Sequence, residues 1–354
     1  MNTLVLDSSQ TEIAGRILRD GGLVVFPTET VYGLGADAQN SAACTAIFAA
    51  KGRPADNPLI VHIVDPAHLE LVAASVDPLS RRLFERFAPG PLTLVLPRAA
   101  GIPDVVTAGL ESVAVRFPAH PVARAVISAA GTPVAAPSAN RSGRPSPTDF
   151  DAAWDHMHGR VDAIVRGEPS QVGLESTVAR VVGSRIELLR EGAITTEMIA
   201  EVVPAGVPVV TVSSYQASVG STAATGPLPG SAAGPAPVPS PGVRHRHYQP
   251  DARVVLAATG EVWATVSRLV SDAAGRSRIG VLAVSGRCIP TSGAIDTRVD
   301  LVTCMSLDEY ARELYRCFRR FDATGCSVIV AEMPEPTGIG SAILDRLRRA
   351  AGQV

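Results

Sequence analysis

Short apolar runs alternate with stretches of helical apolar spacing along the first 203 residues. Continuous runs such as 23–26, 59–64 and 92–96 are typical of strands that are buried on both faces. Stretches such as 8–20 and 78–87 place their apolar residues on one side only, which predicts amphipathic helices. Strands and helices that alternate in this way predict an α/β fold for this part of the chain.

The same alternation returns near residue 251 on a smaller scale. Strands are expected at 254–257, 279–284, near Leu301 and at 327–331, with helical patterns after the first, the third and the last of them. Such a succession favours a small, mostly parallel sheet with helices on both faces. We therefore predict a doubly wound, Rossmann-like domain over residues 251–354.

The segment between the two parts has a different composition. Residues 213–241 are almost entirely Ser, Ala, Gly, Pro, Thr and Val, which bury too little apolar surface to offset the entropy of ordering. This predicts a first domain at 1–203 and a linker at 204–250. The last ten residues of the linker, PGVRHRHYQP, are rich in Arg and His and contain Tyr248, which favours a docking or lid element.

Composition and charge narrow the class of protein. The chain has 354 residues, of which 46% are hydrophobic, and a net charge of −2, so no broad basic field favours nucleic acid. No apolar run reaches the ~18 residues of a membrane span, and the first residues lack the pattern of a signal peptide. The cysteines are odd in number and lack metal-site spacing, which favours reduced thiols in a cytoplasmic protein; they are Cys44, Cys288, Cys304, Cys317 and Cys326.

Polar side chains gather directly after the first buried strand. The stretch FPTETVYGLG (26–35) opens into hydroxyls and a carboxylate, and KGRPADNPLIVH (51–62) follows it. Lys51 is the only lysine in the chain. A compositional drift that replaces lysine by arginine could leave a single lysine by chance. It would also leave one where a phosphate requires a compact ammonium and not a planar guanidinium. We favour the second interpretation, and Lys51 with Arg53 then indicates a nucleotide phosphate chain.

An arginine inside an apolar strand is a second candidate. Arg116 lies in the run VAVRFP, where a charge facing the core is costly without a counter-charge. A bound anion and a structural ion pair both explain it. His120 follows closely, and a lone histidine is more often a surface or capping group than a ligand.

Further strand ends carry hydroxyls, amides and cations, at 136–148 (APSANRSGRPSPT), 173–177 (GLEST) and 188–192 (LLREG). Turns of this composition are either ordinary surface loops or loops that bind phosphate and ribose. The chain has no P-loop, no G-x-S-x-G and no H-E-x-x-H. We therefore expect one bound substrate to attack the phosphate of another, with the protein supplying orientation and charge stabilisation.

At these residues the chain resembles the long, two-domain form of the threonylcarbamoyl-AMP synthase family. The motifs occur in family order over residues 20–250, and they are FPTETVYGLG, KGRPADNPLIVHI, PGPLTLVL, VAVRFPAHP, APSANRSGRPSPT, GLESTV, LLREGAIT and PGVRHRHYQP. The tail departs from the family pattern at Val243 and His245, where Met and an aromatic residue are expected. The resemblance implies a YrdC-like, twisted mixed-sheet α/β domain with a concave site, followed by the smaller Rossmann-like domain.

The resemblance also implies an activity. The family condenses L-threonine, bicarbonate and ATP to L-threonylcarbamoyladenylate and pyrophosphate, the first step of tRNA threonylcarbamoyladenosine modification beside the anticodon. Mg²⁺ is expected through the ATP phosphates, with no protein metal ligands. The implied partners are a tRNA threonylcarbamoyl transferase complex downstream and weakly contacted tRNA, without a membrane.

By motif, the resemblance assigns the site residues. L-threonine would be held by Thr30, His62, His120, Ser138 and Ser176. ATP would be held by Lys51, Arg53, Asn57, Arg116, Asn140, Thr148 and Arg190, with Tyr248 and the linker closing over it. The chemistry, through charge neutralisation and orientation, would be carried by Lys51, Arg53, Ser138 and Asn140.

Two other functions remain open at this point. One is a module of the same fold that grips RNA without turnover, which the near-neutral charge disfavours. The other is a carbamoyl-adenylate-forming enzyme, whose relatives usually carry zinc-finger or second catalytic modules that this chain lacks. The sequence assigns no task to the C-terminal domain, because a Rossmann-like shape alone does not imply one.

Overall fold

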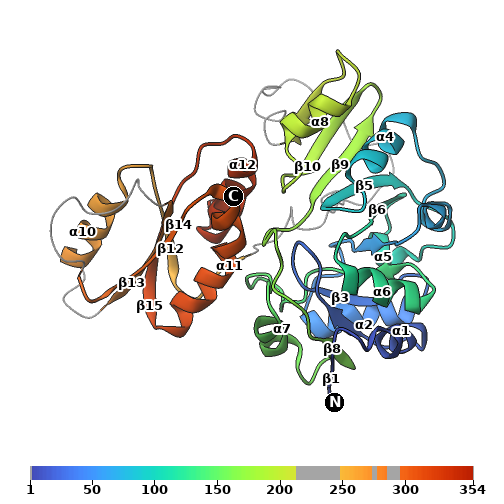
Figure 1. Ribbon diagram of the computed structural model, residues 1–354, viewed down its shortest axis with the longest axis horizontal. Coiled ribbons are helices and arrows are strands. Elements are labelled where there is room, and N and C mark those ends of the chain that lie inside the picture. The colour runs from blue at the N-terminus through green and yellow to red at the C-terminus, as the bar shows by residue number, and fades with distance from the viewer. Residues whose placement is uncertain (1, 213–247, 273–276, 285–295, 354) are drawn as a thin grey trace, which may run out of the picture.

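The computed structural model describes residues 2–212, 248–272, 277–284 and 296–353. The predicted linker stretch at 213–241 lies outside the described residues, as does the docking element except for its last three positions. In Figure 1 the N-terminal part of the chain, blue to yellow-green, forms one unit, and the C-terminal part, orange to red, forms a second unit beside it.

The first unit is built on an eleven-stranded mixed sheet of order β1-β8-β2-β3-β7-β4-β6-β5-β9-β10-β11. The strands are β1 Leu4–Leu6, β2 Val24–Phe26, β3 Gly33–Asp37, β4 Ile60–His62, β5 Leu92–Pro97, β6 Ser112–Arg116, β7 Val134–Ala135, β8 Ala163–Val165, β9 Thr177–Val182, β10 Arg185–Arg190 and β11 Val209–Thr211. The helices are α1 Thr11–Arg19, α2 Ser41–Lys51, η1 Pro66–His68, α3 Leu69–Val72, α4 Pro78–Phe87, α5 Asp104–Thr107, α6 Pro121–Ala130, α7 Phe150–Met157 and α8 Thr196–Val202.

The two faces of this sheet are covered differently. Alternate strand residues such as Val25, Val61 and Val115 join one large core with side chains of α2, α4 and α8. On the opposite face, Val24 and Phe26 pack against α1 and α6 in a smaller core. The middle of that second face carries only a small apolar cluster of strand residues, so no helix of the first unit fills it. This uncovered stretch forms the floor of a concave region.

The second unit is a four-stranded sheet of order β12-β15-β13-β14 in which every described pairing is parallel. Its strands are β12 Arg253–Ala257, β13 Arg278–Val284, β14 Val299–Cys304 and β15 Cys326–Glu332, and its helices are α10 Val262–Asp272, α11 Leu307–Ala323 and α12 Ile339–Ala350. Helix α10 packs on one face, whereas α11 and α12 pack on the other. The predicted fold class, a mixed α/β unit followed by a parallel doubly wound one, is confirmed.

The predicted elements differ from the observed ones mainly at short strands. The polar stretch after the first strand was expected to open into a loop, but its segment Gly33–Asp37 pairs with β2 and β7 and forms strand β3. Strand β11 lies beyond residue 203, where a linker was expected, and it pairs in parallel with β10.

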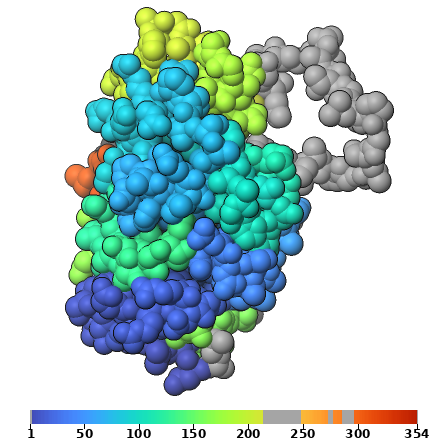
Figure 2. All heavy atoms as spheres, turned by 90° about the vertical axis from the view of Figure 1, so that its right-hand side faces the viewer, coloured from blue at the N-terminus to red at the C-terminus, as the bar shows by residue number. Residues whose placement is uncertain are grey.

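Helices α11 and α12 lie between the second sheet and the first unit (Figure 1). Ion pairs join the units where they meet, from Arg319 to Asp149 and from Arg144 to Asp251. Seen from the side of the first unit, the second unit is almost completely hidden behind it (Figure 2). Residues of the two units therefore contact one another directly.

Two further observations concern the predicted class of protein. In the described ranges, every helix is too short or too polar to cross a membrane. The described cysteines are free and buried, and they are Cys44, Cys304, Cys317 and Cys326; Cys288 lies outside the described residues.

A close approach at Gly35 in β3 generates a stability prediction. A Cβ at Gly35 would lie 2.6 Å from the ring of Phe26 and 2.9 Å from Val134, whereas one at Gly33 meets nothing nearer than 3.5 Å. Gly35→Ala should therefore lower the free energy of unfolding by about 1–3 kcal/mol through overpacking. Gly33→Ala in the same strand, the matched control, should change it by less than about 1 kcal/mol. Urea unfolding measures both, and equal midpoints for the two variants would contradict the expected overpacking.

Candidate active site

A polar cavity opens over the uncovered middle of the first sheet. Its free volume, including the mouth, is about 730 Å³. The lining residues are Thr28, Thr30, Val31, Gly33, Lys51, Arg53, Pro58, Ile60, His62, Arg116, Ala136, Pro137, Ser138, Asn140, Ser142, Glu175, Ser176, Arg190 and Tyr248. Most of the predicted site residues therefore meet in one place.

Strand geometry brings these side chains to the same face. Ile60 and His62 lie two residues apart on β4 and both line the cavity, because alternate side chains of a strand share a face. His62 is directly opposite Arg116 on the parallel neighbour β6. Val61 points to the other side, into the large core.

One side of the cavity is cationic. Lys51 is the last residue of α2, which begins at an Asn40 cap and ends at a left-handed Gly52. Burial, followed by the charge of Arg53, lowers the pKa of the Lys51 ammonium well below its usual value. Burial also lowers the pKa of Arg53, to about 10. Two cations that face a shared cavity favour an anionic ligand.

Lys51 also fixes the loop that follows β7. Its Nζ donates to the backbone carbonyls of Ser138 and Asn140. Within the loop, Ser138 Oγ donates to Asn140 Oδ1 at 2.5 Å, and the Asn140 amide donates to the carbonyls of Arg141 and Arg144. The lysine predicted to bind phosphate thus has a structural task as well, because it holds the Ser–Asn loop against the cavity.

A buried ion pair involves Arg116, a further residue of the cavity lining. Arg116 Nη2 contacts Glu29 Oε1 at 2.7 Å, and Arg116 Nη1 donates to Thr30 Oγ1 at 2.8 Å. Burial would raise the pKa of Glu29, but the charge and hydrogen bond of Arg116 outweigh it, so that the pKa is lowered. Of the two explanations left open for Arg116, the ion pair is present, and the arginine lines the cavity as well.

Arg190 connects the ends of β9 and β10. Its Nε donates to the Ser176 carbonyl at 3.0 Å and its Nη2 to Ser176 Oγ at 3.1 Å. Ser176 Oγ also shares a hydrogen bond of 2.7 Å with Thr93 Oγ1. The hydroxyl and the guanidinium are therefore held in fixed positions at the cavity wall.

A few predicted site residues do not line the cavity. His120 caps α6, where its Nδ1 accepts from the Val122 amide, in agreement with the ordinary role of such a histidine. The side-chain nitrogen of Asn57 is buried without a hydrogen-bond partner among the described residues. Thr148 is buried and accepts from Arg319 of α11. These three residues are therefore not part of the described cavity lining.

Sequence reasoning missed two carboxylates of this site, Glu29 and Glu175. Both lie within the quoted motifs, in FPTET and GLEST, and both are buried and ion-paired. The available signal was a carboxylate flanked by residues of a buried strand end, which requires a counter-charge. The partner of Glu175 is Arg346, far away in the sequence, and no local pattern indicates that pairing.

The cavity offers no cage for a metal ion. Across the described residues, no three His, Cys, Asp or Glu side chains come together at a spacing that would hold one. Glu175 is the carboxylate among the lining residues, and Arg346 engages it; Glu29, which pairs with Arg116, is not part of the lining. The donor set therefore suits an anion rather than a protein-bound cation.

Comparison with known proteins identifies the family. The family model Sua5_yciO_yrdC, described as "Telomere recombination", matches residues 16–192, and the model "Threonylcarbamoyl-AMP synthase, C-terminal domain" matches residues 194–352. The threonylcarbamoyl-AMP synthase of Pyrococcus abyssi is 38% identical over 98% of this chain and 95% of its own length. The chain belongs to the threonylcarbamoyl-AMP synthase family.

Further relatives agree with this membership. The threonylcarbamoyl-AMP synthase of Bacillus subtilis is 38% identical, and the alignment covers 99% of this chain and 95% of the relative. A crystal structure of P. abyssi Sua5 complexed with L-threonine superposes with a TM-score of 0.84 at 36% identity, covering 100% of this chain and 98% of that one. The family predicted from the motifs is confirmed.

His62 generates a prediction about stability and pH. Burial, followed by the charge of Arg116, lowers the pKa of His62 to about 3, whereas an unfolded histidine titrates near ~6.5. At a pH between these two pKa values, the imidazole is protonated in the unfolded state and neutral in the folded state, so the unfolded state binds one more proton. The contribution of the neutral His62 to the free energy of unfolding is therefore complete above about pH 6.5, and it is lost as the pH falls towards 3.

His62→Gln should weaken the pH dependence of stability accordingly. The slope of the free energy of unfolding between pH 6 and pH 4 should decrease by up to about 1.4 kcal/mol per pH unit, which corresponds to one proton. Urea unfolding at several pH values measures it. A wild-type slope in His62→Gln would mean that His62 is charged in the folded state.

Proposed function

We propose that this protein joins L-threonine, bicarbonate and ATP into L-threonylcarbamoyladenylate and releases pyrophosphate. The amine of threonine first takes up bicarbonate as a carbamate, with loss of water. The carbamate carboxylate then attacks the α-phosphorus of ATP, and pyrophosphate leaves. The observation that carries the proposal is the convergence of cations and fixed hydroxyls on one cavity in a member of this family.

The residues divide into two groups in this proposal. Lys51, Arg53 and Arg190 form the triphosphate side, where fixed positive charge stabilises the charge that develops on the phosphorus. Thr30, His62 and Ser176 form the threonine side, where a neutral imidazole and two hydroxyls suit a small polar amino acid. Ser138 and Asn140 lie in the loop that Lys51 holds, and they orient the reacting groups.

Mg²⁺ is proposed as a companion of ATP. The lining residues offer no set of free carboxylates, so the ion would be held by the phosphates, with water completing its shell. When bound there, it neutralises charge on the pyrophosphate that leaves. Orientation and exclusion of water remain tasks of the protein, and Tyr248 at the cavity wall serves the second of them.

The proposed product also implies partners. A carbamoyl adenylate is a reactive mixed anhydride, so a transferase must receive it soon after release. We assign this role to a tRNA threonylcarbamoyl transferase complex that acts on the adenosine beside the anticodon. A cytoplasmic location and a weak contact with tRNA belong to the same proposal.

A pyrophosphate assay tests the reaction directly. Purified protein with ATP should release pyrophosphate only when both L-threonine and bicarbonate are present, and the product should carry the mass of threonylcarbamoyladenylate. Release with carbamoyl phosphate in place of threonine and bicarbonate would favour a carbamoyl-adenylate-forming enzyme. Tight RNA binding without any turnover would favour an RNA-binding module.

Lys51→Met provides a second test. The substitution keeps most of the side-chain volume, but it removes the ammonium from the phosphate side and releases two loop carbonyls. We expect kcat/KM for pyrophosphate release to fall about 10²–10³-fold. Arg81→Met, at an exposed position of α4, should retain wild-type turnover. Turnover of Lys51→Met within about threefold of wild type would refute the role of Lys51.

A further inference from the structure

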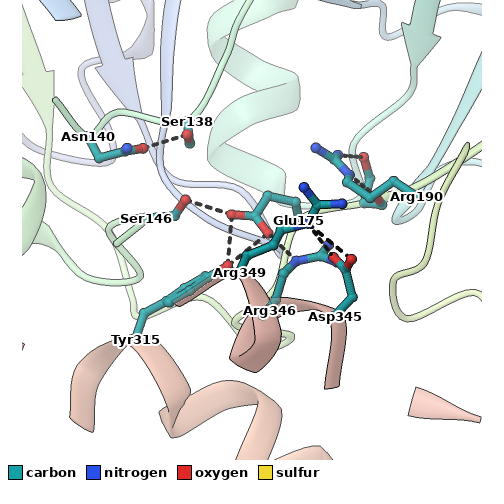
Figure 3. Close-up of polar contacts among 10 residues, drawn as sticks. Ser138, Asn140, Ser146, Glu175, Arg190, Tyr315, Asp345, Arg346 and Arg349 are labelled. Atoms are coloured by element: carbon teal, nitrogen blue, oxygen red, sulfur yellow. Dashed lines mark hydrogen bonds and ion pairs between the residues drawn. The ribbon is translucent and has the colours of Figure 1, made fainter. Parts of the chain in front are cut away.

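Two side chains of the second unit reach the candidate active site without lining its cavity. They are Tyr315 of α11 and Arg346 of α12, and both are 0% exposed. Figure 3 shows them on the side of the second unit, pointing towards Glu175 of the first unit. Their positions show what the C-terminal unit contributes to a site that is otherwise built by the N-terminal one.

Both side chains bind the carboxylate of Glu175. The Tyr315 hydroxyl lies 3.2 Å from Oε1 and 3.0 Å from Oε2, and Arg346 Nε donates to Oε2 at 3.0 Å (Figure 3). Ser146 Oγ donates to Oε1 at 2.6 Å from the first unit. Both oxygens of this buried carboxylate are therefore occupied, and the second unit supplies the charged partner.

Both side chains also contact Tyr248, which lines the cavity. The rings of Tyr248 and Tyr315 stack with centroids 5.4 Å apart and an interplanar angle of 28°. The guanidinium carbon of Arg346 lies 5.6 Å from the centroid of the Tyr248 ring, within reach of a cation–π attraction. Tyr248 has a φ of 69°, a backbone conformation that packing must stabilise in a residue other than glycine.

The positions of Glu175 and Tyr248 matter for different parts of the cavity. Glu175 directly precedes Ser176, whose hydroxyl and carbonyl both accept from Arg190. Tyr248 lines the cavity together with Arg53 and Arg190 on the cationic side. A shift of Glu175 would therefore move the proposed threonine side, and a shift of Tyr248 would change the proposed phosphate side.

A buried ion pair of this kind is weak support for stability, because desolvation offsets much of the attraction. What it does provide is a defined geometry, since Arg346 has one orientation that satisfies Glu175, Asp345 and the Tyr248 ring together. Burial would raise the pKa of Glu175, but the charges of Arg346 and Arg190 outweigh it and lower that pKa, so the carboxylate remains an acceptor.

We infer that Arg346 and Tyr315 are positioning residues of the active site, although they belong to the C-terminal unit and touch no substrate. They hold Glu175 and Tyr248 in the places from which these two shape the cavity. The C-terminal unit thus acts as a rigid support for the catalytic unit, and a catalytic unit without it keeps Ser146 but lacks the two other hydrogen-bond partners of this buried carboxylate. This inference rests on the proposed function for its kinetic consequences.

Substitutions at Tyr315 separate the two contacts. Tyr315→Phe keeps the stacked ring and removes the hydroxyl, so only Glu175 loses a partner. We expect KM for threonine to rise about five- to tenfold, with KM for ATP within about twofold of wild type. Tyr315→Leu also removes the stack on Tyr248, and KM for ATP should then rise about tenfold as well.

Arg346→Met tests the charged contact, and Arg320→Met is its matched control. Arg320 lies on α11 and pairs with Asp300 inside the second unit, away from the cavity. Arg346→Met should lower kcat/KM for both substrates at least tenfold, whereas Arg320→Met should retain wild-type values. Since Arg346→Met leaves a buried carboxylate unpaired and can impair folding, Tyr315→Phe is the deciding variant.

The kinetic pattern distinguishes positioning from a purely structural role. A structural role would reduce the amount of active protein, and hence the apparent kcat, while both KM values stayed at wild type. Wild-type KM values in folded Tyr315→Phe and Tyr315→Leu would overturn the inference.

A second measurement does not depend on the reaction. If the wild-type protein released no pyrophosphate with threonine and bicarbonate, the proposed function would fail, and hydrogen exchange would decide the inference. Peptides that cover residues 173–178 and 248–252 should exchange faster in Tyr315→Leu than in wild type, and Arg320→Met should match wild type. Unchanged exchange in Tyr315→Leu would refute the positioning role.

Discussion

The structure of this protein depends on the burial of positively charged side chains around one cavity. Lys51, Arg116 and Arg190 are each less than a tenth exposed around one cavity. Burial of a charge costs several kcal/mol unless other groups compensate it. Glu29 compensates Arg116, the carbonyls of the Ser138–Asn140 loop bind Lys51, and Ser176 accepts from Arg190. A set of cations stabilised in this way is ready for an anionic substrate and requires little rearrangement to receive it.

The same requirement connects the two units. Glu175 lies at the cavity wall of the first unit, but its charged partner Arg346 comes from α12 of the second. Helices α11 and α12 lie on the side of the second unit that faces the first, and Tyr315 and Arg346 reach Glu175 from them. The Rossmann-like unit therefore contributes side chains from the helices that cover one face of its own sheet. It does not contribute through the strand ends, at which such folds usually bind ligands.

Local patterns in the sequence predicted what depends on neighbouring residues. Long apolar runs and amphipathic spacing predicted strands and helices, because both patterns arise from burial over a few neighbouring positions. The glycine-rich β3 was missed, since its neighbours in the sheet, and not its own residues, make it a strand. His120, Asn57 and Thr148 were expected at the cavity because they stand in the right motifs, yet the described lining contains none of them; His120 caps α6 and Thr148 accepts from Arg319.

The sequence by itself determined the family, the α/β class, and which strand ends carry cations and hydroxyls, because these follow from ordered motifs and short-range spacing. Only the tertiary structure decided which of these groups meet. It showed that Arg116 pairs with Glu29, that Lys51 holds a loop as well as facing the cavity, and that Arg346 pairs with Glu175 across 171 positions of chain. The reason is physical: a buried charge takes its partner from whichever segment the fold brings within about 3 Å, and that proximity has no local signature.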